Sequence, residues 1–270
     1  MNPTAARSRV GRMNGRTLLS PDALGVADRV IAEESARRAH VVVYLSGAHA
    51  YGFPSPDSDL DLKAIHVAST RELLGFGRPQ AGVDRMEVLD GVEIDYTSNE
   101  LGHALSGILR GNGNFIERVA GKATLCGSPW LEELRQLVIA SLSRRAHAHY
   151  RGFSHSQLHE LEARPTVKAL LYVLRTALTG IHLLRSGQLV VDVNELLDEY
   201  GLGEARSLVA QKRAGERSPL GAEQLEAWRA RASALLERLE KSRESSPLPE
   251  SPPNEAELED WLVRVRTDLL

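Results

Sequence analysis

Residues 47–63 constrain the fold of this chain more than any other segment. They read Gly-Ala-His-Ala-Tyr-Gly-Phe-Pro-Ser-Pro-Asp-Ser-Asp-Leu-Asp-Leu-Lys and follow a continuous apolar run at 41–45. Such a run is typical of a strand that is buried on both faces. Because side chains alternate along a strand, Asp59 and Asp61 share one face, while the leucines beside them point into the core. The segment therefore predicts a strand, a glycine turn, a proline-containing loop and a second strand.

The glycine turn and the two aspartates indicate a binding chemistry. A glycine turn at the start of a helix offers backbone N–H groups to phosphate. Two carboxylates side by side repel each other unless a cation lies between them, and hard oxygen ligands suit Mg²⁺. A solvated, acid-rich turn is the alternative, and we expect Asp57, which follows Pro56, to be a turn residue. We predict a metal and triphosphate site that combines Gly47 with Asp59 and Asp61.

A hairpin further along the chain offers a third carboxylate. The Asp-Gly pair at 90–91 is a strong two-residue turn signal between apolar segments at 83–89 and 92–97. The second of these strands carries Glu93 and Asp95 on one face. If it lies beside the strand with the first two acids, three carboxylates can hold the two metal ions used in nucleotidyl transfer. Periodicity does not distinguish Glu93 from Asp95.

The remaining pattern predicts an α/β fold: a small mixed β-sheet with helices, followed by an all-helical C-terminal domain. Strands are expected at 41–45, 60–67, 83–89 and 92–97. Candidate helices are 24–39, 99–110, 114–120, 129–150, 156–186 with a break near Pro165, 193–199, 203–213, 221–241 and 256–268.

Composition limits the other classes of function. The chain has 270 residues, 42% of them hydrophobic, which is enough for two domains. A net charge of -3 gives no general field for nucleic acid. The single cysteine, Cys126, excludes an internal disulfide and predicts a cytoplasmic protein. No apolar run approaches the length of a membrane span, so we expect no membrane partner.

Four motifs resemble a known family. The motifs at 47–52 (Gly-Ala-His-Ala-Tyr-Gly) and 57–63 (Asp-Ser-Asp-Leu-Asp-Leu-Lys) together resemble the nucleotidyltransferase signature of the DNA polymerase beta superfamily. The closer likeness is to its bacterial and phage branch linked with RNA repair. The motif Gly-Asn-Gly-Asn-Phe-Ile-Glu at 111–117 resembles that branch's Gly-Asn-Pro-Asn-x-x-Glu. Lys-Ala-Leu-Leu-Tyr-Val-Leu-Arg at 168–175 resembles its helical Lys-x-x-x-His/Tyr-x-x-Arg.

The resemblance implies a role for individual residues. It makes Asp59, Asp61 and Asp95 the catalytic metal ligands, with Asp95 preferred to Glu93 on family position alone. The backbone at Gly47 is implied to hold the β- and γ-phosphates. The nucleotide-binding residues that we predict are Ser46, Gly47, Ala48, His49, Lys63, Lys168, Tyr172 and Arg175. Among these, Lys168 and Arg175 would reach the triphosphate across a cleft, and Tyr172 would stack on the base.

Several of these positions have a structural alternative. Ala48 departs from the family, which has serine there; losing this hydroxyl removes about 1–2 kcal/mol of polar contact, and Ser46 is not its equivalent. His49 contacts phosphate or caps the turn locally, and Lys63 contacts phosphate or pairs with the acids beside it. The helix at 168–175 can equally be a polar stripe on a buried helix. The motif at 111–117 is expected to be structural, with Asn114 and Glu117 forming a capping box.

The resemblance divides the chain into parts. They are a disordered basic tail at 1–22, a nucleotidyltransferase domain at 23–125, a helical domain at 126–241, a Pro/Ser linker at 242–255 and a C-terminal helix at 256–270. The last helix could dock on this chain or on a partner. The histidine-rich patch that includes His155 and His159 is expected to be solvated surface rather than a zinc site.

The expected activity is transfer of a nucleoside monophosphate from an NTP, with ATP as first choice, to a hydroxyl group with release of pyrophosphate. Mg²⁺ is the expected cofactor and Mn²⁺ its alternative. The likeness to RNA-repair proteins implies an RNA or DNA 3′ end as acceptor. A small molecule, a protein side chain, and a catalytically decayed nucleotide-binding module remain open as alternatives. The sequence predicts neither the preferred base nor the oligomeric state.

Overall fold

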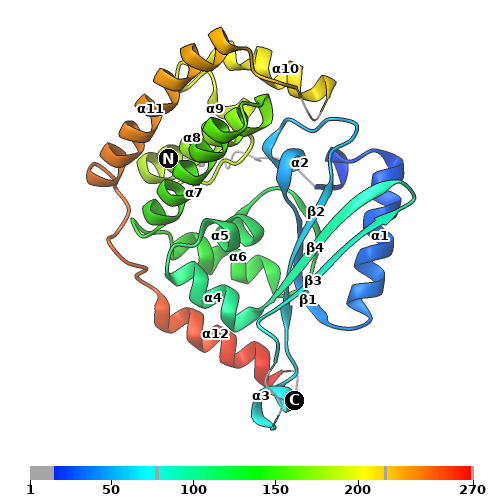
Figure 1. The fold of residues 1–270 in the computed structure, drawn as a ribbon. Helices are drawn as coiled ribbons and strands as arrows, with labels where there is room; N and C mark the ends of the chain where they lie inside the picture. The colour runs from blue at the N-terminus through cyan, green and yellow to red at the C-terminus, as the bar shows by residue number, and fades with distance from the viewer. Residues whose placement is uncertain (1–14, 77–78, 216–217, 269–270) are drawn as a thin grey trace, which may run out of the picture.

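A computed structural model describes residues 15–76, 79–215 and 218–268, and it has one mixed five-stranded sheet (Figure 1). The order across the sheet is β3-β4-β2-β1-β5. The strands are β1 (Ala39–Leu45), β2 (Leu60–Val67), β3 (Gly82–Leu89), β4 (Val92–Glu100) and β5 (Thr124–Gly127). Only the β2 and β4 pair is parallel among these neighbours. The predicted fold class is confirmed.

The sheet register follows from the predicted turn and the alternating side chains. Asp90 (φ 50°) and Gly91 (φ 80°) are both left-handed, as a tight hairpin turn between β3 and β4 requires. The parallel pairing places Asp61 of β2 opposite Asp95 of β4. Since paired residues on adjacent strands share a face, both carboxylates lie on one side of the sheet.

Helices cover both faces of the sheet (Figure 1). On one face α1 lies against the strands, where Arg85 of β3 forms ion pairs with Glu33 and Glu34 of α1. On the other face α5 reaches the sheet through Arg118, which donates to the Ala64 carbonyl at 3.3 Å. The elements of this part are η1 (Gly15–Leu18), α1 (Pro21–Ser35), α2 (Gly47–Tyr51), α3 (Thr70–Leu74), α4 (Leu101–Leu109), α5 (Gly113–Ala120) and α6 (Leu131–Ala140).

The C-terminal half is helical and is built around α8. Its elements are α7 (Ala146–Ala163), α8 (Val167–Ser186), α9 (Val193–Leu196), η2 (Gly203–Ala205), α10 (Arg206–Ala214), α11 (Ala222–Glu244) and α12 (Glu255–Thr267). By length and composition α8 passes the test for a membrane span, contrary to the expectation from sequence. However, 89% of its apolar window is buried, which is typical of a core helix. Helices α7 and α11 pack against it (Figure 1).

Several predicted elements and boundaries were wrong. The helix expected at 24–39 is α1, which ends at Ser35, and β1 begins at Ala39. The helix expected at 129–150 is two helices, because residues 141–145 form a turn in which Arg144 bonds to the carbonyls of Ser246 and Leu248. The expected tail ends earlier: η1 begins at Gly15 and Ser20 caps α1, whereas residues 1–14 lie outside the described part. Strand β5 was not predicted and extends the sheet to residue 127.

The segment expected as a linker is held against the body of the protein. The Ser246 hydroxyl donates to the Leu184 carbonyl at 2.5 Å, and the Asn254 amide donates to the Leu137 carbonyl at 2.9 Å. Helix α12 then docks on its own chain, with Trp261 2% exposed and its indole N–H donating to Glu133 at 3.1 Å. The alternative left open by the sequence is therefore resolved in favour of docking in cis.

Candidate active site

Gly47 forms the turn between β1 and α2, and its conformation explains the need for glycine. Its φ of +63° lies in the left-handed region, and a Cβ atom there would overlap the carboxylate of Asp61. The Ser46 N–H donates to the Asp61 carbonyl at 2.9 Å, which fixes the turn to β2. The backbone of the glycine turn therefore lies directly beside β2, the strand that carries Asp61, as the sequence predicted.

Two of the three predicted carboxylates are neighbours across the sheet. Asp61 and Asp95 face each other in register, and Lys63 lies between them. The Lys63 ammonium group is 2.7 Å from Asp95 Oδ2 and 3.6 Å from Asp61 Oδ1. Asp59 precedes β2 by one residue and is half-buried, on the same side of the strand as Asp61. Glu93 lies two residues before Asp95 on β4 and is exposed, so the register favours Asp95 as the third acid.

The acids suit a cation, although they are not gathered into a closed metal cage. Within residues 15–76, 79–215 and 218–268, no cluster of three or more His, Cys, Asp or Glu side chains is compact enough to hold a metal ion. An ammonium group already bridges Asp61 and Asp95, which shows that this position accommodates positive charge. Oxygen ligands alone are the set that Mg²⁺ prefers. The residues therefore fit a divalent cation that would compete with Lys63.

The charge of Asp61 is costly in this environment. Its pKa is raised to about 6, chiefly by burial; Lys63 and Lys168 lower this pKa, whereas the charges of Asp95 and Asp59 raise it. A cation beside the carboxylate would offset this cost, since it favours the ionised form. Perturbed acids of this kind are frequent at functional sites. The pKa shift thus agrees with a site built to receive positive charge.

The later helix α8 brings two of the predicted residues toward the glycine turn. Lys168 is half-buried and close enough for its charge to lower the pKa of Asp61. The Tyr172 ring packs edge-on against Tyr51 and Phe53, with ring centroids 5.8 Å and 5.5 Å away. Lys168 and Tyr172 therefore lie at the boundary between the helical half and the turn, which is where a nucleotide contact requires them.

Arg175 has a different place from the one predicted. It is 1% exposed, and its guanidinium donates to Glu117 through two bonds of 3.0 and 3.2 Å. A guanidinium committed in this way is not available to a triphosphate, so the prediction for Arg175 was wrong.

The capping box predicted with Asn114 was wrong for the same reason. Asn112 caps α5 instead, while Glu117 points inward and pairs with Arg175.

The three other turn residues are accounted for by local contacts. His49 is half-buried, and burial lowers its pKa, while the neighbouring backbone of Leu18 and Ser58 raises it. Its Nδ1 atom has no hydrogen-bond partner among the described residues. Ala48 is 7% exposed, so its methyl group packs inward. Ser46 is half-buried, and its hydroxyl lies 3.2 Å from the Tyr51 hydroxyl. Of the two interpretations of Lys63, the structure has the ion pair with the acids.

Sequence reasoning missed a set of contacts from α9 and α10 to the loop that carries Asp59. Lys212, fully buried, donates to the Ser55 hydroxyl at 2.8 Å. Arg213 and Asn194 donate to the Gly52 carbonyl at 2.7 and 2.8 Å. These residues lie more than a hundred positions from the loop in sequence, and their spacing contains no signal for the contact. The helical half therefore fixes the loop between the glycine turn and β2.

Comparisons with known proteins found one family and two individual proteins to which this chain is similar. The sequence model of the RNA repair pathway DNA polymerase beta family (RlaP) matches residues 27–264. An uncharacterized protein of Methanocaldococcus jannaschii is 31% identical over 169 residues, which cover 59% of this chain and 67% of that protein. A solved nucleotidyltransferase-like protein from Exiguobacterium sibiricum 255-15 aligns over 91% of this chain and 80% of its own, with 11% identity and a TM-score of 0.34. That TM-score is too low to carry an argument.

Proposed function

Since the chain belongs to the RNA repair pathway DNA polymerase beta family, we propose that it transfers a nucleoside monophosphate from an NTP to a hydroxyl acceptor and releases pyrophosphate. The observation that supports this most is the register of Asp61 and Asp95 beside the Gly47 turn. Carboxylates and a phosphate-sized backbone turn on one face of a sheet are the parts that nucleotidyl transfer needs. We place the reaction in the cytoplasm, with ATP and Mg²⁺ as the first substrate and cofactor to test.

Each residue has a proposed task at this site. Asp59, Asp61 and Asp95 hold the divalent cation, which when bound lowers the pKa of the attacking hydroxyl and neutralises the triphosphate. The backbone at Gly47 holds the β- and γ-phosphates. The Lys63 ammonium group, once released from Asp61 and Asp95, would offer its positive charge to the leaving pyrophosphate. Lys168 approaches from the helical half and adds positive charge on the far side of the triphosphate.

We propose an RNA or DNA 3′ end as the acceptor, because the family is named for RNA repair. A second candidate is a neutral or cationic small molecule, or a protein side chain. It is favoured by Asp84 and Glu93, which are exposed on the same face as Asp95 and would repel a phosphate backbone. The two candidates share the donor site and differ only in what enters beside Asp95.

The test follows α-labelled ATP, GTP, CTP and UTP with Mg²⁺ or Mn²⁺, offering a short RNA, a short DNA and a cell lysate as acceptors. The Asp59→Ala/Asp61→Ala double variant should transfer no label. Asp57→Ala is the matched control, because Asp57 is exposed on the preceding turn, and it should transfer label like the wild type. Label on the oligonucleotides supports a terminal nucleotidyltransferase, and label on protein or small molecules supports the second candidate. Nucleotide binding without any transfer would instead indicate a decayed site.

A further inference from the structure

Tyr51 is the last residue of α2 and joins the glycine turn to the protein interior. It is 6% exposed, and its hydroxyl lies 3.2 Å from the Ser46 hydroxyl on one side. On the other side it donates to Glu117 Oε2 at 3.5 Å. The Arg175 guanidinium covers its ring at 3.4 Å from the centroid. The Tyr51 hydroxyl is therefore a link between the turn and the buried Glu117–Arg175 pair.

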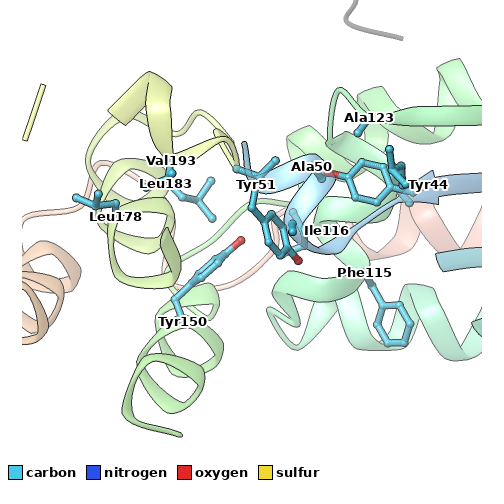
Figure 2. Close-up of a cluster of buried hydrophobic side chains, with 14 of the residues drawn as sticks. Tyr44, Ala50, Tyr51, Phe115, Ile116, Ala123, Tyr150, Leu178, Leu183 and Val193 are labelled. Carbon is cyan, nitrogen blue, oxygen red and sulfur yellow. The ribbon is translucent and has the colours of Figure 1, made fainter. Parts of the chain in front are cut away.

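The buried end of this link is firmly held. Glu117 is 2% exposed and receives two bonds from Arg175 and a third, of 3.1 Å, from the Tyr150 hydroxyl. Figure 2 shows Tyr51 from α2 and Tyr150 from α7 approaching the same region from opposite sides. A buried carboxylate paired with a guanidinium in bidentate geometry has little freedom to move. Glu117 thus provides a fixed partner for the Tyr51 hydroxyl.

The other end of the link is the half-buried Ser46 hydroxyl. Ser46 is the residue before α2, where a serine usually caps the helix, but its side chain makes no capping bond. It is half-buried beside Gly47, and the neighbouring Asp61 is close enough to affect the pKa of Tyr51, which burial raises. The Ser46 hydroxyl is thus oriented by Tyr51 next to the proposed phosphate site rather than by the helix.

We propose that Tyr51, fixed by the Glu117–Arg175 pair, is a positioning residue that orients the Ser46 hydroxyl to donate to a phosphate of the NTP. This inference rests on the proposed function. The Tyr51 hydroxyl has one proton and two neighbours, Glu117 and Ser46. When NTP binds, this proton turns from Glu117 to the Ser46 oxygen, and Glu117 keeps its three bonds from Arg175 and Tyr150. The Ser46 proton is then released to point at the phosphate. Because the Tyr51 hydroxyl can either accept or donate a hydrogen bond, the Ser46 side chain keeps one rotamer with and without bound NTP.

The chain offers a matched pair of variants to test this. Tyr51→Phe and Tyr150→Phe each remove one hydroxyl that bonds to Glu117, but only Tyr51 also bonds to Ser46. We would measure the dissociation constant of each protein for ATP and for AMP with Mg²⁺ by calorimetry, and the melting temperature of each. Tyr51→Phe and Ser46→Ala should each weaken ATP binding about five- to tenfold, as expected for one lost hydrogen bond to a charged group, with little effect on AMP.

The double variant Ser46→Ala/Tyr51→Phe should bind ATP no more weakly than either single variant, because the two residues act in one chain. Tyr150→Phe should have a lower melting temperature than the wild type, but the same dissociation constant for ATP. The inference is wrong if Tyr51→Phe binds ATP normally, or if Tyr150→Phe weakens binding as much as Tyr51→Phe does. If the wild type itself binds no NTP with Mg²⁺, the proposed function is wrong and this inference with it.

Discussion

The Lys63 ammonium group lies 2.7 Å from Asp95 Oδ2, across the parallel boundary between β2 and β4. Its other carboxylate neighbour, Asp61, is 3.6 Å away. Without a cation these two acids would repel each other in a half-buried environment. In the proposed function, Lys63 lies where the divalent cation would bind, so binding of the cation would exchange one positive charge for another.

This relationship predicts opposite effects of Lys63→Met on the metal-free and the metal-bound protein. Without metal, the variant should lose about 1–2 kcal/mol of folding stability, because the acids are left unpaired. With Mg²⁺ it should reach half-maximal thermal stabilisation at a lower concentration, because no ammonium group competes. Urea unfolding and melting curves over a Mg²⁺ titration measure both effects.

Lys122→Met is the control for the loss of a surface charge. Lys122 forms a similar 2.8 Å ion pair with Glu195, but both side chains are more than a third exposed. Its removal should change stability by less than about 1 kcal/mol and leave the Mg²⁺ titration unaltered. An unaltered titration for Lys63→Met as well would mean that Lys63 does not occupy the cation position.

Gly47→Ala should disable the site through geometry alone. The left-handed backbone of Gly47 costs an alanine about 1–2 kcal/mol, and the added Cβ atom would also displace the Asp61 carboxylate. We expect NTP to produce no Mg²⁺-dependent rise in melting temperature. Gly25→Ala on the exposed face of α1 is the control, because a Cβ atom there meets nothing within 4 Å. It should raise stability by up to about 1 kcal/mol, and normal NTP binding by Gly47→Ala would refute the site.

Lys168 and Arg175 were predicted from one motif, but the structure predicts different effects when each is replaced by alanine. One substitution should lower activity and the other should lower stability. Lys168→Ala should lower transfer activity about tenfold or more while its melting temperature stays near that of the wild type. Arg175→Ala should cost about 3–5 kcal/mol of stability, because it leaves the buried Glu117 charge without its partner. Urea unfolding and label transfer separate the two. Equal losses of stability would contradict the assignment of Lys168 to the site.

The sequence predicted that Asp59 and Asp61 share a face because a strand has an obligatory period of two, whereas Asp95 was preferred to Glu93 on the family resemblance alone. Asp59 and Asp61 had to share a face, and the Asp-Gly turn had to return the chain as a hairpin. The structure pairs β2 with β4 in register, and this pairing brings Asp95 to Asp61. Local rules of this kind act over a few residues, so a single sequence contains them.

The contacts that the sequence did not reveal join distant segments. The pairing of Glu117 with Arg175 spans 58 residues, and that of Lys212 with Ser55 spans 157. A polar residue on a buried helix face has the same local pattern whether it binds a ligand or a buried partner. The choice depends on which helix packs opposite, and this is decided by the tertiary fold. For this reason Arg175 was assigned to the nucleotide and Glu117 to a helix cap.

The stability of the protein should fall in mild acid because of His40. Its ring nitrogens lie 2.9 Å from the Ser35 hydroxyl and 2.8 Å from the Tyr96 hydroxyl, and burial, followed by the charge of Arg38, lowers its pKa to about 4. In the unfolded chain His40 takes up its proton near pH 6.5. The unfolded state therefore binds more protons below that pH, and stability declines from pH 6.5 toward pH 4 by up to about 3 kcal/mol.

Urea unfolding of the wild type and of His40→Gln between pH 7.5 and pH 4.5 measures this contribution. The variant should lose less stability over the interval, since one protonation step is removed. His159→Gln is the control, because His159 is exposed. The dependence of its stability on pH should follow that of the wild type. Parallel profiles for His40→Gln and the wild type would show that His40 does not contribute.

Met86 provides a probe for the acceptor. It pairs in register with Asp95 on β4 and is 80% exposed, and it shares the face of Asp95 with the 62% exposed Val88. Because the proposed reaction places the attacking hydroxyl beside Asp95, we expect the terminal base of an oligonucleotide acceptor to stack over Met86. The chain has three methionines, so methyl-¹³C labelling gives few signals, and Met86→Leu assigns the one of interest. A 3′-hydroxyl dinucleotide should shift the Met86 signal and leave those of Met1 and Met13 in place. Transfer of label to that dinucleotide without any shift would place the acceptor elsewhere.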